Sequence, residues 1–226
     1  MASLAQLLAN HGSILVLDAA SGSIQTGLLR KDQPAIWHQF PGDAGQQLFT
    51  GAEMCLRQAA LGLSNVAAFV FCEGPGSMLG VRTVAMAIRT WTALKPRPVY
   101  RFQSLALLAH GLDQQGTQSP FSVIADARRD TWHCVTVSSR GTVQPLRRVP
   151  ASDLAQDPTP LRISSAFRAW TPPPRAGEDC TYHLSGLFAR LPETDLFSET
   201  DTPDSFQHES PEYKKWTAEV HQAPSP

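Results

Sequence analysis

The sequence predicts an α/β fold of two lobes, each built on a mixed sheet, with the second lobe reduced. Apolar runs of strand length alternate with helical patterns through the first half of the chain. The first three runs are joined by turns too short for a helix, so they should pair as an antiparallel meander. After residue 115, strand-like runs dominate and helical patterns become rare. We therefore expect a first lobe over residues 1–112 and a smaller second lobe, with an acidic tail, over 113–226.

The first lobe should open with the meander, whose strands are expected at 13–20, 24–31 and 35–40. Asp43 can then cap a helix over 45–61, which Gly62 can terminate. The run from Val66 to Cys72 is continuously apolar, as in a buried central strand. The remaining elements are expected to be a helix at 78–94, a strand at 99–102 and a helix at 104–112 opened by Ser104.

The second lobe should be mostly strands, which are expected at 121–128, 131–139, 143–149 and 161–167. Residues 171–175 form a proline-rich loop, and 193–212 are acidic, either a poorly ordered stretch or a tail that follows the surface. The second half thus reads as a reduced copy of the first. This order of elements matches the ribonuclease-H-like, actin-like (ASKHA) fold.

Composition limits the classes of function. The chain has 226 residues, 42% of them hydrophobic and 17% charged, with a net charge of −1. The arginine pairs at 128–129 and 147–148 and the lysine pair at 214–215 are short and scattered. Because phosphate contacts supply most of the affinity for nucleic acids, the chain is not expected to bind one alone.

The same composition predicts a soluble protein of a reducing cytoplasm. The four cysteines form no CxxC pair, and three of them lie in apolar segments, as buried reduced thiols do. No Lys or Arg precedes residue 30, so a signal-peptide n-region is missing. The longest apolar run is far short of the ~20 residues that a membrane helix needs.

Residues 72–82 read CEGPGSMLGVR, a glycine-rich loop between a strand and a helix. Its glycines permit close backbone approach, Pro75 stiffens the turn, and Ser77 can cap the helix. Free N–H groups at a helix N-terminus suit an anion. The candidate anion or nucleotide loop is therefore Gly74, Gly76, Ser77, Gly80 and Arg82. The favoured alternative is a tight strand-to-helix turn, since no lysine or pair of metal-binding carboxylates stands beside the loop and Glu73 would repel a phosphate.

Few residues suggest catalysis. Asp18 ends the first strand, where kinases of this fold place a magnesium-linked aspartate, but a lone carboxylate is more often a turn residue. The histidines are all more than ten residues apart, so no helix-borne metal pair exists. Asp126 with Arg128 reads as a hairpin ion pair. No Ser-His-Asp or Cys-His set can be proposed from spacing. We expect a pseudo-enzyme, with no catalytic or metal residues.

The helix at 45–61 carries two apolar stripes, which suggests that it lies between its own core and something else. Its small residues, with those of the helix at 78–94, allow close helix–helix approach. We therefore expect a partner interface made by Leu48, Phe49, Ala52, Cys55, Leu56, Ala59, Met86 and Arg89. Without the partner, the same patch can pair with a second copy. The alternative is ordinary core packing.

Four segments together resemble one known family. CEGPGSMLGVRTVAMAIRTWTAL resembles the signature stretch of the TsaB family, also called YeaZ, which usually reads GPGSFTGLR. ILVLDAASGSIQTGLL resembles its opening ILAIDTS strand and hairpin, ADARRDTWHCV its IDAR…EVY strand pair, and PEYKKW (211–216) its C-terminal PxYLR motif. The matches run in order from Ile14 to Trp216. Ala19-Ala20 and Met78-Leu79 depart from the family pattern, and a usual histidine-serine-glutamate is replaced by PGDAGQQL.

The resemblance implies a role in making threonylcarbamoyladenosine (t6A) beside the anticodon of tRNAs that read codons beginning with A. In that family the chain is the non-catalytic partner of TsaD, a paralogue that carries the metal, the nucleotide and the chemistry. The ATPase TsaE joins the pair, and tRNA is met only through the complex. No cofactor is expected in this chain itself, with ATP or ADP at most at the partner interface. Three alternatives stay open: an ATP-dependent small-molecule kinase of the same superfamily, a peptidase, and an adaptor that no longer meets TsaD.

Overall fold

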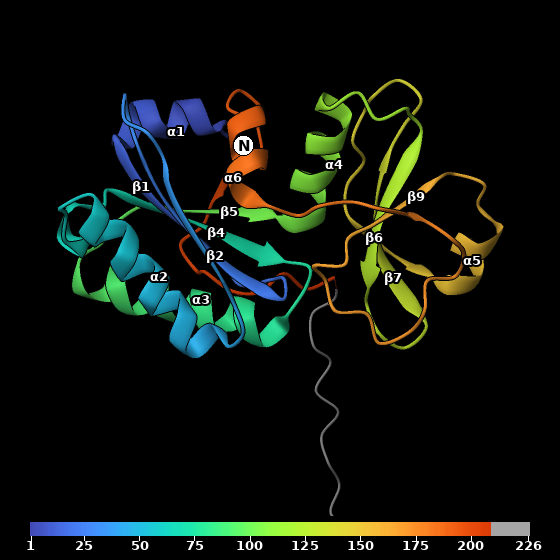
Figure 1. Cartoon of the computed structure of the whole chain (residues 1–226), viewed down its shortest axis with the longest axis horizontal. Helices are drawn as coiled ribbons and strands as arrows, with labels where there is room; N and C mark the ends of the chain where they lie inside the picture. The colour runs from blue at the N-terminus through green and yellow to red at the C-terminus, as the bar shows by residue number, and fades with distance from the viewer. Residues whose placement is uncertain (209–226) are drawn as a thin grey trace, which may run out of the picture.

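Two mixed sheets lie side by side, each with helices against it, in a computed structural model that describes residues 1–208 (Figure 1). The first sheet has the strand order β11-β5-β4-β1-β2-β3. Its strands are β1 (Ser13–Asp18), β2 (Ser23–Arg30), β3 (Ile36–Pro41), β4 (Ala68–Gly74), β5 (Val99–Gln103) and β11 (Ser198–Glu199). Strands β1, β2 and β3 form the predicted antiparallel meander, while β4 and β5 run parallel to β1. The mixed sheet is confirmed.

The second sheet repeats this connectivity with shorter strands. Its order is β10-β9-β6-β7-β8, which matches β5-β4-β1-β2-β3 position by position. Its strands are β6 (Phe121–Asp126), β7 (Thr131–Val137), β8 (Arg147–Pro150), β9 (Leu161–Ile163) and β10 (Glu178–Asp179). The pairing is again antiparallel from β6 to β8 and parallel from β6 through β9 to β10. The predicted reduced copy is thus an internal repeat of the fold.

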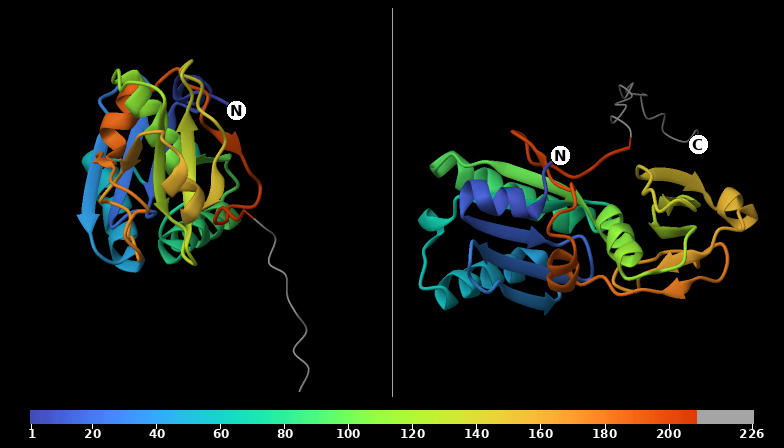
Figure 2. Two further views of the ribbon diagram at one scale, coloured as in Figure 1. Left: turned by 90° about the vertical axis from the view of Figure 1, so that its right-hand side faces the viewer. Right: turned by 90° about the horizontal axis from the view of Figure 1, so that it is seen from above.

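Helices cover the sheets on both faces. They are α1 (Leu4–His11), α2 (Ala44–Gln58), α3 (Met78–Leu94), α4 (Ser104–Gln114), α5 (Ala151–Gln156) and α6 (Leu184–Arg190), with a short 3-10 helix at Leu63–Asn65. Helices α2 and α3 lie together on the outer face of the first sheet, and α4 lies between the two sheets (Figure 2). None of the helices in residues 1–208 has the length and apolar content that a membrane span requires.

Alternate residues of the central strands point to opposite faces of the first sheet, so each strand contributes to two hydrophobic clusters. Ile14 and Val16 of β1 belong to a cluster shared with α1, α4, α6 and the second sheet. Leu15 and Leu17 point to the opposite face, where α2 and α3 pack. Because both faces of β1 and β4 are buried, these strands read as continuous apolar runs in the sequence.

Several expected details are wrong. Helix α2 ends earlier than 61, and Ala60 (φ 53°), not Gly62, takes the left-handed conformation after it. Ser104 does not cap α4; its hydroxyl donates to the carbonyl of Pro75 at 2.6 Å. Helices α1, α5 and α6 were not expected. The strand expected at 143–149 contributes only one bridge, at Val143, before β8 begins.

The lobe boundary also needs correction. After the second sheet the chain returns to the first lobe, where α6 packs and β11 pairs with β5. The described part of the acidic tail then follows the surface: the Phe206 N–H donates to the Glu73 carbonyl (2.7 Å), and Asp204 pairs with Arg89 (3.3 Å). The PEYKKW motif at 211–216 lies outside the described residues. The second lobe is therefore an insertion between parts of the first.

Candidate functional site

The glycine loop joins β4 to α3 in a conformation that needs its glycines. Gly74 and Gly76 have φ values of 110° and 150°, which side chains rarely adopt. A methyl group on Gly76 would run into the carbonyl of Ala20, and one on Gly80 would run into that of Ala19. The loop therefore sits directly against the turn that follows β1. Glycine is therefore required at positions 76 and 80 for the loop to approach this turn so closely.

The polar groups of this loop are largely used inside the chain. The Ser77 N–H donates to the Ala20 carbonyl at 2.7 Å, and the Ser77 hydroxyl accepts from the Gly80 N–H at 3.2 Å, as the predicted cap. The side chain of Arg82 lines a groove on the outer face of α3, among the apolar side chains described below. These contacts favour the tight strand-to-helix turn over an anion loop.

Asp18 is sealed in the interior at the end of β1. One carboxylate oxygen accepts from the Ala20 N–H at 2.6 Å, and the other accepts from the Tyr182 hydroxyl at 2.7 Å. Burial raises the pKa of Asp18 to about 6, although these two hydrogen bonds lower it. Asp18 acts as the expected turn residue, since its carboxylate accepts a hydrogen bond from the N–H of Ala20, two residues on. The contact with Tyr182, 164 residues away, could not be read from the sequence.

Glu73, the acid beside the loop, is likewise engaged. Its buried carboxylate accepts from Arg101 at 2.9 Å and from the Gln103 amide at 3.1 Å. Arg101 and Gln103 both lie on β5, next to β4 in the sheet. The carboxyl ends of β1, β4 and β5 are the edge where open α/β sheets usually bind ligands. At this edge the two carboxylates are held by protein groups.

Asp126, at the end of β6, occupies the position in the second sheet that Asp18 occupies in the first. It does not form the expected ion pair with the Arg128 side chain. Instead one oxygen accepts from the Arg128 backbone N–H at 2.6 Å, and the other from the N–H groups of Trp170 (2.7 Å) and Thr171 (2.9 Å). Partial burial acts to raise the Asp126 pKa, but these hydrogen bonds outweigh it and hold the pKa below its usual value.

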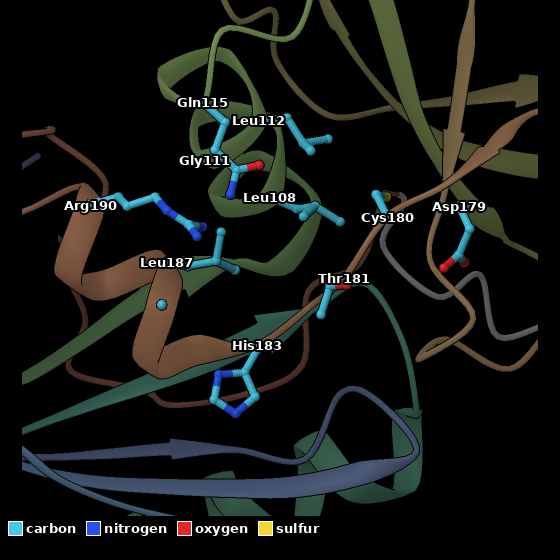
Figure 3. Close-up of a pocket in the computed structure, with 11 residues that line it drawn as sticks. Leu108, Gly111, Leu112, Gln115, Asp179, Cys180, Thr181, His183, Leu187 and Arg190 are labelled. Carbon is cyan, nitrogen blue, oxygen red and sulfur yellow. The ribbon is translucent and has the colours of Figure 1, made fainter.

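A hollow of about 470 Å³ lies between α4 and α6. Leu108 and Leu187 form apolar parts of its wall, and Arg190 reaches in from α6. His183, the N-cap of α6, lies at the edge of the hollow with its ring turned away (Figure 3). The Arg190 guanidinium donates to the side-chain oxygen of Gln115. The hollow thus has an apolar wall and mixed polar groups at its edge.

The expected interface residues divide into two sets. Leu48, Ala52, Cys55 and Leu56 are buried in the chain's own core, so these four cannot form a docking surface. Ala59 is half-buried and packs against the same core. The small residues of α2 serve the sheet, since Gly51 lies directly against Thr26 of β2. For these residues the alternative of core packing is correct.

The remaining interface residues are exposed. Phe49 and Met86 expose 47% and 57% of their surface, and Leu79, which was not in the expected set, exposes 73%. Arg89 is exposed and paired with Asp204 of the tail. A groove of about 440 Å³ runs between the outer sides of α2 and α3, lined by Phe49, Leu79, Arg82, Thr83, Met86, Ala87, Thr90 and Trp91.

Aromatic contacts shape this groove. The rings of Phe49 on α2 and Trp91 on α3 meet edge to face, with centroids 6.0 Å apart. Trp91 also contacts Phe69 of β4 beneath it. The floor of the groove is therefore anchored to the sheet, while Leu79 and Met86 remain available to a partner. Clustered exposed apolar side chains of this kind mark interaction surfaces.

A family model and two solved structures match the chain. The model described as "TsaD: tRNA N6-adenosine threonylcarbamoyltransferase" matches residues 46–149. A solved structure described as YeaZ from Pseudomonas aeruginosa is similar at 21% identity with a TM-score of 0.61, covering 79% of this chain and 90% of that one. A second, described as an uncharacterized protein with similarity to peptidase YEAZ from Pseudomonas aeruginosa, has 21% identity and a TM-score of 0.60, with 79% and 89% covered.

No curated protein matches the sequence. The solved structures, at this identity, establish the shared fold. The family-model match adds sequence evidence across α2, the glycine loop, α3 and the β6–β7 hairpin. The family model matches less than half of the chain, so the comparisons show similarity to the TsaD family over residues 46–149 and a fold shared with the YeaZ structures.

Proposed function

We propose that the chain belongs to the TsaB/YeaZ family and is the non-catalytic partner of a TsaD-type protein in t6A modification of tRNA. The exposed groove between α2 and α3 carries the proposal, because it offers a TsaD-type partner an apolar surface separate from the chain's own core. Metal, nucleotide and transfer chemistry belong to the partner, TsaE joins the pair, and tRNA is met through the complex. The chain needs no cofactor of its own for this role.

The carboxylates at the carboxyl ends of β1 and β4 are already hydrogen-bonded to protein groups, which supports a non-catalytic role. A kinase of this fold would use the Asp18 edge for magnesium and phosphate, yet both Asp18 oxygens already accept hydrogen bonds from protein groups. Glu73 is paired with Arg101 in the same way. Titration of the chain alone with ATP and Mg²⁺ should therefore give no binding in the micromolar range. Micromolar binding would instead favour the kinase.

The peptidase alternative finds weaker support. Ser185 and His183 are in contact at 2.9 Å, but they lie two residues apart at the start of α6, where such contacts form locally. Within residues 1–208, no carboxylate hydrogen-bonded to His183 is seen that could orient it as a base. A triad needs that third group.

Charge placed in the groove tests the proposal. Leu79→Glu and Met86→Glu should each weaken binding to the TsaD-type partner about tenfold or more, because each buries a carboxylate in an apolar interface. Calorimetric titration of the purified chains measures the affinity. When the chain is added to the reconstituted modification reaction at a concentration too low to saturate its partner, the rate of t6A formation should fall in proportion to the lost binding.

Leu94→Glu is the matched control. Leu94 is on the same helix and is 82% exposed, but it does not line the groove. Its replacement should leave binding unchanged. Equal affinities for all three variants and the natural chain would contradict the proposed interface. Ala52→Glu is unsuitable, since Ala52 is buried in the core and a charge there would unfold the chain.

A further inference from the structure

The loop between β6 and β7 has an unusual backbone. Arg128, Arg129 and Asp130 have φ values of 63°, 50° and 59°, so three successive side-chain-bearing residues are left-handed. Residues with side chains adopt this conformation only rarely, and seldom in succession. The Thr131 hydroxyl donates to the Arg128 carbonyl (2.7 Å), and Asp126 accepts from the Arg128 N–H (2.6 Å). The loop is therefore held in a defined conformation, in which Arg128 and Arg129 are exposed.

An exposed tryptophan stands beside this loop. The backbone N–H of Trp170 donates to the Asp126 carboxylate. The Trp170 residue is 53% exposed. The guanidinium of Arg168 lies over the ring at 3.7 Å and that of Arg128 at 4.8 Å. Cation–π contacts of this kind orient guanidinium groups without neutralising their charge.

The fold also brings in an arginine from β8. The Arg148 side chain donates to the Thr131 hydroxyl at 2.8 Å and to the Ala127 carbonyl, so it lies at the base of the same loop. Two arginines that are distant in the sequence, Arg128 and Arg168, thus meet at one indole, and Arg148 lies at the base of the adjoining loop. Among residues 1–208, no carboxylate within ion-pair distance of Arg128, Arg148 or Arg168 is found. Two acids at the loop, Asp126 and the exposed Asp130, reduce this positive charge but do not cancel three guanidiniums.

We propose that Arg128, Arg148, Arg168 and Trp170 form an RNA-contacting surface on the second lobe. Arginine donors suit phosphate oxygens in a planar, bidentate manner. Guanidinium planes and aromatic rings also stack on unpaired bases, which is the usual mode of recognition for RNA loops. The choice of RNA among polyanions rests on the proposed function. The surface lies on the β6–β7 side of the molecule, away from α2 and α3, so a partner in the groove leaves it open (Figure 1).

The test uses the full chain alone, so that its outcome does not depend on partner assembly. A fluorescent anticodon stem-loop RNA is titrated across a salt series. The natural chain should bind weakly at low salt, with an affinity that falls linearly on a log–log plot. The double variant Arg128→Gln/Arg168→Gln should lower the slope by about 0.7 for each lost phosphate contact, roughly 1.4 in total.

The matched control is Arg57→Gln/Arg140→Gln. Arg57 is on α2, and Arg140 lies at the opposite end of β7 from the loop; both are exposed. This control should keep the natural slope. Equal slopes for the two double variants, or no binding by the natural chain at low salt, would overturn the RNA surface. Displacement of the RNA by polyglutamate as readily as by unlabelled RNA would also overturn it, in favour of an acidic-peptide surface. None of these outcomes bears on partner binding through the groove.

Discussion

Replacing Gly80 by alanine should destabilise the chain by about 3 kcal/mol, which for a chain of this size lowers Tm by roughly 6–12 °C. The added methyl would run into the backbone carbonyl of Ala19, which follows β1 and cannot rotate away. Loop and turn would then have to separate, breaking the bond from the Ser77 N–H to the Ala20 carbonyl. Urea-induced unfolding measures the free-energy change.

Gly186→Ala is a close control, because Gly80 and Gly186 are both the third residue of a helix. A methyl on Gly186 would meet only the mobile end of Arg190, at 3.9 Å. This variant should be neutral or stabilised by up to about 1 kcal/mol, as expected for glycine to alanine in a helix. If Gly80→Ala were as stable as Gly186→Ala, the close packing of the glycine loop on the β1 turn would be wrong.

Asp18→Asn should change how stability depends on pH. Burial raises the Asp18 pKa to about 6 in the folded chain, against 3.8 for a free aspartate side chain. Between these pH values the folded state binds a proton that the unfolded state has lost, so the contribution of Asp18 to stability falls as pH rises. The loss is complete above about pH 6 and amounts to about 3 kcal/mol. The amide stays neutral, so it avoids this loss.

The measurement compares the unfolding free energies of the Asp18→Asn variant and the natural chain at pH 4 and pH 7.5. The variant should gain on the natural chain by about 2.4 kcal/mol between the two values, because part of the loss has already occurred at pH 4. Asn can still accept from the Ala20 N–H, and the Tyr182 hydroxyl also lies 3.9 Å from the Cys72 sulfur. Asp32→Asn, which removes an exposed carboxylate from the β2–β3 turn, controls for the loss of one charge. A difference that is the same at both pH values would refute the sealed, proton-binding state of Asp18.

Local patterns were sufficient for the central elements of the fold. The apolar run of β4 and the Ser77-capped helix α3 lie where the sequence places them, because burial on both faces and a capped amphipathic stripe are encoded within each segment. The segment 184–208 could not be placed in the same way. Helix α6 is short and β11 has two residues, so their return to the first lobe depends on tertiary contacts.

The candidate site was predictable only in part. Periodicity shows that α2 has two apolar stripes, but it does not say which stripe faces the sheet; Phe49 turned out to be exposed and Leu48 buried. Contacts between residues far apart in the sequence could not be predicted either, because local patterns carry no information about them. Nothing near Asp18 points to Tyr182, and the pairing of Trp170 with Arg128 joins segments 42 residues apart in the chain.

Amide hydrogen exchange of the chain with and without the proposed TsaD-type partner tests the docking face most directly. Complex formation should slow exchange in α2 and in the N-terminal half of α3, where Phe49, Leu79 and Met86 lie, while the β6–β7 hairpin stays unchanged. Protection confined to the second sheet, with α2 and α3 exchanging as in the free chain, would contradict the account.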